Sequence, residues 1–263
     1  MRVHLVQYDV AWESPSQNRD RVESLLARAP VEPGNLIVLP EMYATGFSLN
    51  VETTADDDGE DAAFLADLAR RTGAAVVGGI TARGERKALN RALAFGPTGE
   101  TLASYDKIHP FTFGREHEIF AGGDRVATFE WGGLKIGLSV CYDLRFPELY
   151  RALLGAGAEA MIVIANWPSA RREHWLTLLT ARAIENQAAV IAVNRTGADP
   201  FLEYSGDSRV IGARGETLAR ADREEGATSA EVDPAGVRNW REAFPAWRDG
   251  RVGDGGRVRE ESL

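Results

Sequence analysis

Short apolar runs rich in valine and isoleucine alternate with amphipathic stretches along most of the chain. The runs have the length and β-branched content of strands, and they cover residues 2–9, 36–41, 74–80, 91–96, 134–140, 161–166, 189–195, 208–213 and 228–233. Helical periodicity covers residues 16–29, 59–73 and 172–187. We expect Ser16 or Asn18 to cap the first helix and Gly73 to end the second. Because strands and helices alternate, the pattern predicts an α/β domain with a mixed sheet or sheets.

Two pairs of strand-like runs are joined by segments with the composition of turns. "FGPTGETL" and "IGARGETL" predict hairpins at residues 91–104 and 208–221. No change in composition marks a second domain, so we interpret residues 1–263 as a single domain. The polar segment from about 234 to 263 carries Trp240, Phe244 and Trp247 among charged residues. It predicts a C-terminal arm that packs on this subunit or on another, frayed at residues 253–263.

Composition narrows the partners of the protein. A chain of 263 residues, 44% hydrophobic, can bury a substantial core, and its net charge of −9 argues against nucleic acid as a partner. No apolar run reaches the ~18 residues of a membrane span, and no signal peptide is recognisable, so we expect no membrane association. The single cysteine, Cys141, cannot form an intrachain disulfide, which favours a reducing cytoplasm. We expect a small-molecule partner rather than nucleic acid or a membrane.

Cys141 stands where the apolar run 134–140 ends and an amphipathic stretch is about to begin. The free N–H groups at the start of a helix favour an anion, and this placement resembles a nucleophile elbow. On that hypothesis Cys141 is a nucleophile and the Tyr142 N–H donates to an oxyanion. The alternative is that Cys141 is a small buried hydrophobe, the usual state of a cysteine.

Two further residues at strand ends can take part in such chemistry. Glu41 follows an apolar run and a proline, where burial can raise a carboxyl pKa and make it a general base. Lys107 follows another run and can hold a thiolate ionised or stabilise an oxyanion. Among 30 basic residues the only other lysines are Lys87 and Lys135. The alternatives are a solvated acid for Glu41 and a surface lysine for Lys107.

Other chemistries remain open from the residues alone. His174 or His117 can serve as the base of a Cys–His hydrolase. A metal site made of His109, Glu116 and His117 lacks recognisable ligand spacing, so we expect no metal and no cofactor. A non-enzymatic scaffold that binds a partner is a further alternative.

The segments "LPE", "YDK-H" and "VCYD-RFPE-YR", in this order and spacing, resemble the nitrilase superfamily of carbon–nitrogen hydrolases. The resemblance continues through "NWP", "RAIENQ" and "GDSRVIGARGE" to "FPAWRD", so it covers nearly the whole chain. It implies that Glu41 is the base, Lys107 the oxyanion cation and Cys141 the nucleophile. It also implies a four-layer α-β-β-α sandwich that dimerises, with which the mixed-sheet prediction is compatible.

The family often has a second glutamate, seven residues before a glycine. In "EHEIFAGG" Glu116 lies seven residues before Gly123, so Glu116 matches this position and Glu118 does not. The resemblance therefore adds Glu116 to the expected catalytic residues.

Within the superfamily, "NWPSAR", "RAIENQ" and "GDSRVI" most resemble bacterial ω-amidases, which hydrolyse the terminal amide of 2-oxoglutaramate. N-carbamoyl amino acid amidohydrolases and aliphatic amidases or nitrilases are the alternatives. A 2-oxo acid needs a cation for its carboxylate, and arginine suits that task. We favour Arg171 and keep Arg145 and Arg195 as alternatives.

Aromatic side chains are expected to wall the substrate pocket. Trp167 follows the strand that ends near residue 166, and Phe113 lies in the loop after Lys107. An aromatic residue in either place can equally belong to the core.

Overall fold

The computed structural model describes residues 1–250, and its framework is two six-stranded mixed sheets. The first has the order β14-β1-β2-β3-β4-β5 and the second the order β13-β12-β9-β8-β7-β6. The first sheet contains β1 (Arg2–Gln7), β2 (Leu36–Val38), β3 (Ala75–Ala82), β4 (Leu89–Phe95), β5 (Thr101–Asp106) and β14 (Gly226–Glu231). The second contains β6 (Thr128–Trp131), β7 (Leu134–Val140), β8 (Ala160–Ala165), β9 (Ala189–Asn194), β12 (Arg209–Ile211) and β13 (Thr217–Arg220).

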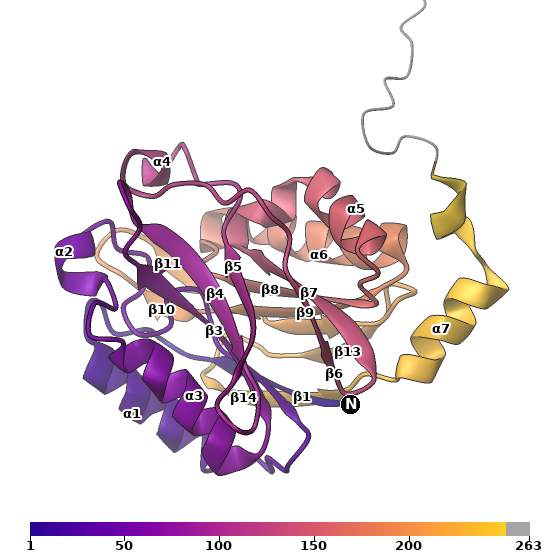
Figure 1. Cartoon of the computed structure of the whole chain (residues 1–263), viewed down its shortest axis with the longest axis horizontal. Coiled ribbons are helices and arrows are strands. Elements are labelled where there is room, and N and C mark those ends of the chain that lie inside the picture. Colours follow the sequence, from indigo (N-terminus) through magenta and orange to yellow (C-terminus); the bar gives the residue numbers. More distant parts are fainter. Residues whose placement is uncertain (251–263) are drawn as a thin grey trace, which may run out of the picture.

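Helices cover the outer faces of both sheets, which gives four layers (Figure 1). The first sheet is covered by α1 (Pro15–Leu26) and α3 (Glu60–Thr72), and the second by α5 (Pro147–Gly155) and α6 (Arg172–Asn186). Shorter elements are α2 (Val51–Thr54), α4 (Glu116–Ile119) and a small ribbon of β10 (Thr196–Ala198) and β11 (Glu203–Ser205). The four-layer α-β-β-α prediction is confirmed.

Alternating side chains of the first sheet explain this layering. Leu36 and Val38 belong to a core cluster shared with the second sheet, whereas Ile37 and Leu39 pack in a cluster with residues of α1 and α3. Successive side chains of a strand point to opposite faces, so one continuous apolar run can supply both cores. Both sheets are therefore buried on two sides.

The parallel centres of the two sheets determine where chemistry can occur. β1, β2 and β3 run parallel, as do β7, β8 and β9, and the sheets meet face to face. Polar residues that directly follow β2, β7 and β8 therefore emerge at neighbouring carboxyl ends. In open α/β sheets, ligands bind in crevices at these ends.

Several boundaries differ from those predicted. β2 ends at Val38, because the chain turns at Pro40 and places Glu41 in a tight loop. The first helix begins at Pro15 after Ser14, so the prediction that Ser16 or Asn18 caps it is wrong. Asn18 instead binds the backbone of Ala11 and Ala44 from inside the helix. Pro15 supplies a favourable first helical residue without needing a side-chain cap.

Other local predictions are confirmed. Gly73 ends α3 in the left-handed conformation with φ +65°, which glycine adopts without a steric penalty. The two predicted hairpins are the antiparallel pairs β4–β5 and β12–β13.

The described part of the C-terminal arm packs on its own subunit. Helix α7 (Pro234–Ala243) lies at the edge of the molecule (Figure 1). Gln187 Nε2 donates to the Phe244 carbonyl at 2.6 Å, and Arg241 Nε donates to the Gln187 carbonyl at 2.8 Å. The predicted frayed segment, 253–263, lies outside the described residues. Between residues 1 and 250, no helix combines the length and apolarity that a membrane span requires.

Gly79 of β3 keeps the loop that carries Glu41 against the sheet. A Cβ there would lie 2.8 Å from the Met42 nitrogen and 2.9 Å from Glu41 Cα and Ile164 Cδ1. The loop is also held by hydrogen bonds from the Gly79 N–H to the Pro40 carbonyl and from the Tyr43 N–H to the Gly79 carbonyl. Two backbone atoms of the loop and one core side chain therefore converge on a position where only hydrogen fits.

We expect Gly79→Ala to lower the free energy of unfolding by about 1–3 kcal/mol, because the added methyl overpacks this contact. Gly155→Ala is the control, since a Cβ there meets nothing within 4 Å. It should leave stability unchanged or raise it by up to about 1 kcal/mol. Urea denaturation of both variants measures the difference, and equal stabilities would contradict the close contact.

Candidate active site

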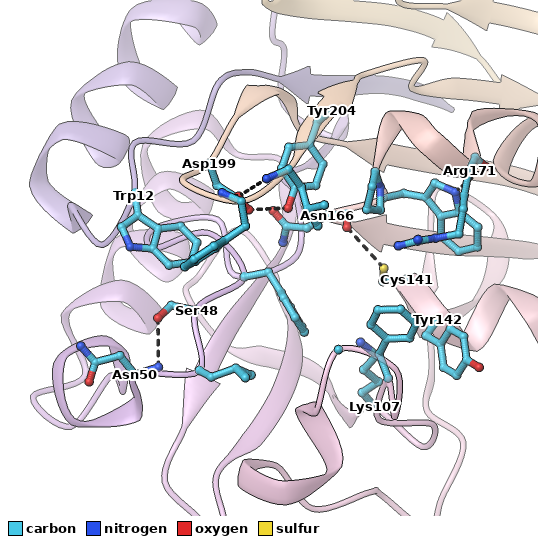
Figure 2. Close-up of a pocket in the computed structure, with 18 of the residues that line it drawn as sticks. Trp12, Ser48, Asn50, Lys107, Cys141, Tyr142, Asn166, Arg171, Asp199 and Tyr204 are labelled. Atoms are coloured by element: carbon cyan, nitrogen blue, oxygen red, sulfur yellow. Dashed lines mark hydrogen bonds between the residues drawn. The ribbon is translucent and has the colours of Figure 1, made fainter.

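A cavity of about 490 Å³ opens at the carboxyl ends of the strands, with Cys141 in its wall (Figure 2). Its lining combines a few polar groups with many aromatic and aliphatic side chains, an arrangement common in small-molecule sites. The lining residues include Trp12, Glu13, Phe47, Ser48, Leu49, Asn50, Lys107, Phe111, Cys141, Tyr142, Arg145, Asn166, Trp167, Arg171, Asp199, Phe201, Leu202 and Tyr204.

Cys141 sits at a sharp turn between β7 and the helical segment that follows it. Its φ is +47°, a left-handed conformation that is uncommon for a residue with a side chain. A 3₁₀-helix spans Cys141–Arg145, and α5 begins two residues later. The first N–H groups of such a turn have no partner within it. The backbone therefore has the strained strand–turn–helix form that the sequence analysis expected around a nucleophile.

The buried carboxylate of Asp143 fastens this turn to the loop that carries Lys107. Asp143 Oδ2 accepts from the Val140 N–H at 3.0 Å and the Tyr105 hydroxyl at 2.7 Å. Its Oδ1 accepts from the His109 N–H at 3.1 Å and lies 2.7 Å from His109 Nδ1. One side chain thus ties the end of β7 to the segment after β5. Because this joins the two sheets, it fixes the relative positions of Cys141 and Lys107.

Lys107 lies between two carboxylates in a fully buried cluster. Its Nζ is 3.0 Å from Glu41 Oε1 and 2.9 Å from Glu116 Oε2. Asn90 Nδ2 bridges the same acids, donating to Glu41 Oε1 at 2.7 Å and to Glu116 Oε1 at 2.8 Å. Each of the three charged side chains is at most 1% exposed. The structure therefore brings together Glu41, Lys107 and Glu116, which sequence reasoning placed on separate segments.

The environment holds Glu41 ionised. Burial on its own would raise the pKa of Glu41, but the positive charge of Lys107 and hydrogen bonds from Asn90, Lys107 and the Asn166 N–H lower it below its usual range. The expectation of a raised Glu41 pKa is therefore wrong, because a buried cation and three donors outweigh the burial. Burial opposes the charge of Lys107, yet the two carboxylates raise its pKa above the ordinary lysine value.

Cys141 is a neutral thiol in this environment. Burial raises its pKa well above the ordinary value, the negative charge of Glu41 raises it further, and Lys107 only partly opposes them. The expectation that Lys107 holds a resting thiolate is therefore wrong, since that charge is already shared by two carboxylates. A thiol beside an ionised carboxylate can lose its proton during attack, which is general-base chemistry.

Two asparagines of the site were missed by the sequence analysis. Asn90 lies just outside the predicted strand 91–96, and Asn166 ends the predicted strand 161–166. Asn166 donates its N–H to Glu41 Oε2 at 2.8 Å, and its carbonyl lies 3.8 Å from Cys141 Sγ. For Asn166 the sequence did contain a signal, because a polar side chain at the end of a buried strand must find hydrogen-bond partners.

The arginines predicted to meet a substrate carboxylate fall into two groups. Arg145 and Arg171 line the cavity, with Arg145 4.8 Å above the Trp167 ring and Arg171 5.4 Å from the Phe111 ring. Arg195 instead points away, fully buried, and pairs with Asp9 at 2.6 Å. Arg195 is therefore a structural residue, because its charge is already neutralised.

Of the two aromatic residues predicted to wall the pocket, only Trp167 lines the cavity. Trp167 is buried in the cavity wall, and its indole Nε1 donates to the Arg171 carbonyl at 2.8 Å. Phe113 is 85% exposed and does not belong to the lining, so its predicted place in the wall is wrong. Phe111 occupies that place instead, with its ring 5.4 Å from the Arg171 guanidinium.

The histidine hypotheses do not fit the geometry. His174 is exposed on α6, and its Nδ1 lies 3.2 Å from Arg145 Nη2. His117 is exposed as well, whereas His109 binds Asp143. Glu116 faces Lys107, so His109, Glu116 and His117 do not converge on one point. Among the described residues that line the cavity are Lys107 and Cys141 but no histidine.

Comparison with known proteins agrees with this geometry. The carbon–nitrogen hydrolase family model matches residues 2–242. The chain is 35% identical over 250 residues to the 2-oxoglutaramate amidase of Bacillus subtilis, covering 94% of this chain and 96% of that one. It is 37% identical over 255 residues to the omega-amidase YafV of Escherichia coli, covering 95% and 96%.

Solved structures give the same picture. A CN-hydrolase superfamily protein of Xanthomonas campestris, with an arsenic adduct in its active site, is 38% identical with a TM-score of 0.91, covering 97% of this chain and 99% of that one. An amidase of Nesterenkonia, in which acrylamide has added to the active-site cysteine, is 27% identical with a TM-score of 0.81, covering 93% and 98%.

The buried cluster leads to a specific prediction about stability. Lys107→Met removes the cation and leaves two buried carboxylates facing each other. We expect the free energy of unfolding at neutral pH to fall by about 3–5 kcal/mol. Lys87→Met is the control, because Lys87 is exposed and its loss should change stability by no more than about 0.5 kcal/mol.

The stability that Lys107→Met loses relative to the wild type should become smaller as the pH is lowered. Without the cation, the pKa values of the two carboxyls in the folded state rise above their unfolded values, so the folded state binds more protons. Stability then falls as pH rises through that range and is recovered as pH falls. Guanidinium denaturation across pH measures this, and a variant as stable as Lys87→Met at every pH would refute the interpretation.

Proposed function

The chain belongs to the carbon–nitrogen hydrolase family, and we propose that it is an ω-amidase. The substrate is a short 2-oxo acid with a terminal primary amide, 2-oxoglutaramate or 2-oxosuccinamate, and the products are the 2-oxo diacid and ammonia. One observation carries this proposal: the cavity that exposes Cys141 also holds Arg145 and Arg171. A substrate with an amide at one end and a carboxylate at the other matches these two features.

The first half of the proposed reaction forms a thioester. Glu41 takes the proton of Cys141 as the sulfur attacks the amide carbonyl, and the carbonyl electrons move to oxygen. Lys107 and the Tyr142 N–H stabilise this oxyanion, and each such donor typically contributes ~10²–10³ in rate. The C–N bond then breaks, and ammonia leaves with the proton held by Glu41. Glu116 holds Lys107 in place through the contacts described above.

The second half hydrolyses the thioester. Water replaces ammonia, and Glu41 takes its proton as the oxygen attacks the acyl carbon. When the C–S bond breaks, the sulfur recovers that proton and the acid is released. Glu41 is suited to both halves because it starts ionised beside a neutral thiol.

Arg145 and Arg171 provide the proposed carboxylate site. A guanidinium presents several donors in one plane, which suits a carboxylate. Arg145 lies over Trp167 and Arg171 over Phe111, so both heads are held by aromatic rings. Trp167 links this site to the strand end that carries Asn166.

The proposal also covers where the enzyme is located and its oligomeric state. The reaction needs a free thiol, which suits the reducing cytoplasm. We also propose a homodimer or larger oligomer, on the family likeness and on apolar residues left outside the core, such as Ile184 of α6 at 54% exposed. Light scattering that returns the 28.6 kDa monomer at micromolar concentration would contradict the oligomer.

Ammonia release from a substrate panel tests the function. The panel contains 2-oxoglutaramate, 2-oxosuccinamate, glutamine, asparagine, N-carbamoyl amino acids and simple nitriles, with Cys141→Ala as the blank. We expect the highest kcat/KM for the two 2-oxo amides and no activity in the blank. A preference for carbamoyl compounds or nitriles would sink the ω-amidase assignment, and an active Cys141→Ala would exclude the covalent route.

Arg171→Ala should raise KM for 2-oxoglutaramate by about ten- to hundred-fold with little change in kcat. The reason is that the substrate loses a charged hydrogen bond made equally in the ground state and the transition state. Arg145→Ala should act in the same direction. Arg83→Ala is the control, because this exposed arginine pairs with Glu52 and Asp57 away from the cavity. An unchanged KM in Arg171→Ala would remove Arg171 from the carboxylate site.

A further inference from the structure

Asn166 is the residue that contacts both the base and the nucleophile of the proposed reaction. It directly follows β8, is 5% exposed and lines the cavity (Figure 2). Its side-chain Nδ2 donates to the backbone carbonyl of Glu41 at 2.8 Å and approaches the carboxylate oxygen Oε2 of Glu41 at 3.3 Å. The backbone carbonyl of Asn166 accepts a hydrogen bond from Cys141 Sγ at 3.8 Å. A single residue therefore joins the loop after β2 to the turn after β7.

The two oxygens of Glu41 have different partners. Oε1 accepts from Lys107 Nζ at 3.0 Å and from Asn90 Nδ2 at 2.7 Å. Oε2 accepts from the Asn166 N–H at 2.8 Å and, less closely, from the Asn166 side chain. An oxygen beside an ammonium is the poorer proton acceptor, since the cation stabilises its negative charge. Oε2 is therefore the oxygen better placed to receive a proton.

Asn166 is itself held in place from the next strand. The N–H of its neighbour Trp167 donates to Asn194 Oδ1 at 2.7 Å, and Asn194 Nδ2 donates back to the Trp167 carbonyl at 3.1 Å. These two hydrogen bonds hold the backbone directly after Asn166 against β9. Asn166 can therefore act as a rigid support rather than follow the movements of Glu41.

We propose that Asn166 is a positioning residue: it orients Glu41 so that Oε2 faces the thiol of Cys141 as its proton acceptor. This rests on the proposed roles of Glu41 and Cys141 but not on the identity of the amide. Asn166 touches the base and the sulfur from one side, whereas Lys107 and Asn90 hold the base from the other. Loss of the side-chain donor leaves Glu41 charged, but it removes the bond to the Glu41 backbone carbonyl and the second contact to Oε2, so the carboxylate is held less firmly toward the sulfur.

Asn166→Ala tests this, because it removes the side-chain donor and keeps the backbone N–H. We expect kcat for 2-oxoglutaramate to fall about 10²-fold with KM nearly unchanged, the cost of a misplaced catalytic group. The acid limb of the kcat/KM profile should also move to higher pH, because the carboxylate loses a donor that favours its ionised form.

Asn186→Ala is the matched control. Asn186 is fully buried, and like Asn166 it donates Nδ2 to a backbone carbonyl, that of Arg182, while its Oδ1 has no partner among the described residues. It lies at the end of α6, outside the cavity lining. It should lose stability as a buried asparagine does, yet keep the wild-type kcat and pH profile.

Alkylation of Cys141 by iodoacetamide separates this proposal from the substrate assignment. In Asn166→Ala the alkylation rate should fall, and its acid limb should shift upward, whichever amide the enzyme hydrolyses. Asn166→Ser, which keeps a shorter donor, should recover part of the rate, and it replaces the alanine variant if that one does not fold. If both Asn166 variants match Asn186→Ala in kcat, pH profile and alkylation, Asn166 is merely structural and the proposal is overturned.

Discussion

The ion pair of Lys107 with Glu41 and Glu116 is the interaction on which the site depends. Three buried charges are tolerable only if each is paired and hydrogen-bonded. Asn90 and the N–H groups of Phe111 and Asn166 complete that pairing. No one of these three side chains can be displaced alone, because its movement would leave another buried charge without a partner. The burial that makes the cluster costly also makes its geometry rigid.

That rigidity is passed to the nucleophile through short connections between the two sheets. Asp143 ties the turn at Cys141 to the segment around His109, just beyond Lys107. Asn166 ties the opposite side of the same turn to Glu41. These cross-links lie where the carboxyl ends of the strands meet. The sandwich therefore acts as a frame that sets the distance between a carboxylate and a sulfur supplied by different sheets.

The protonation states follow from the same arrangement. Because the two carboxylates share one ammonium, a second anion at the sulfur is disfavoured, and Cys141 rests as a neutral thiol. Glu41 rests ionised, which is the form that the proposed base needs. A neutral resting thiol is also less open to oxidation than a thiolate. The wall of the cavity beside this thiol carries Arg145 and Arg171.

The sequence by itself determined the layer class, most strands, the helix end at Gly73 and the three strand-end residues Glu41, Lys107 and Cys141. These are local properties, since apolar periodicity and turn chemistry depend on neighbours along the chain. The four-layer order, and Glu116 as an expected catalytic residue, came from resemblance. Only the tertiary structure decided that Asn90 and Asn166 complete the site, that Phe111 rather than Phe113 faces the cavity, and that Arg195 is already paired. It also reversed the expected pKa shift of Glu41. Each of these depends on which distant groups meet inside the protein, because a buried charge responds to its nearest partners in space.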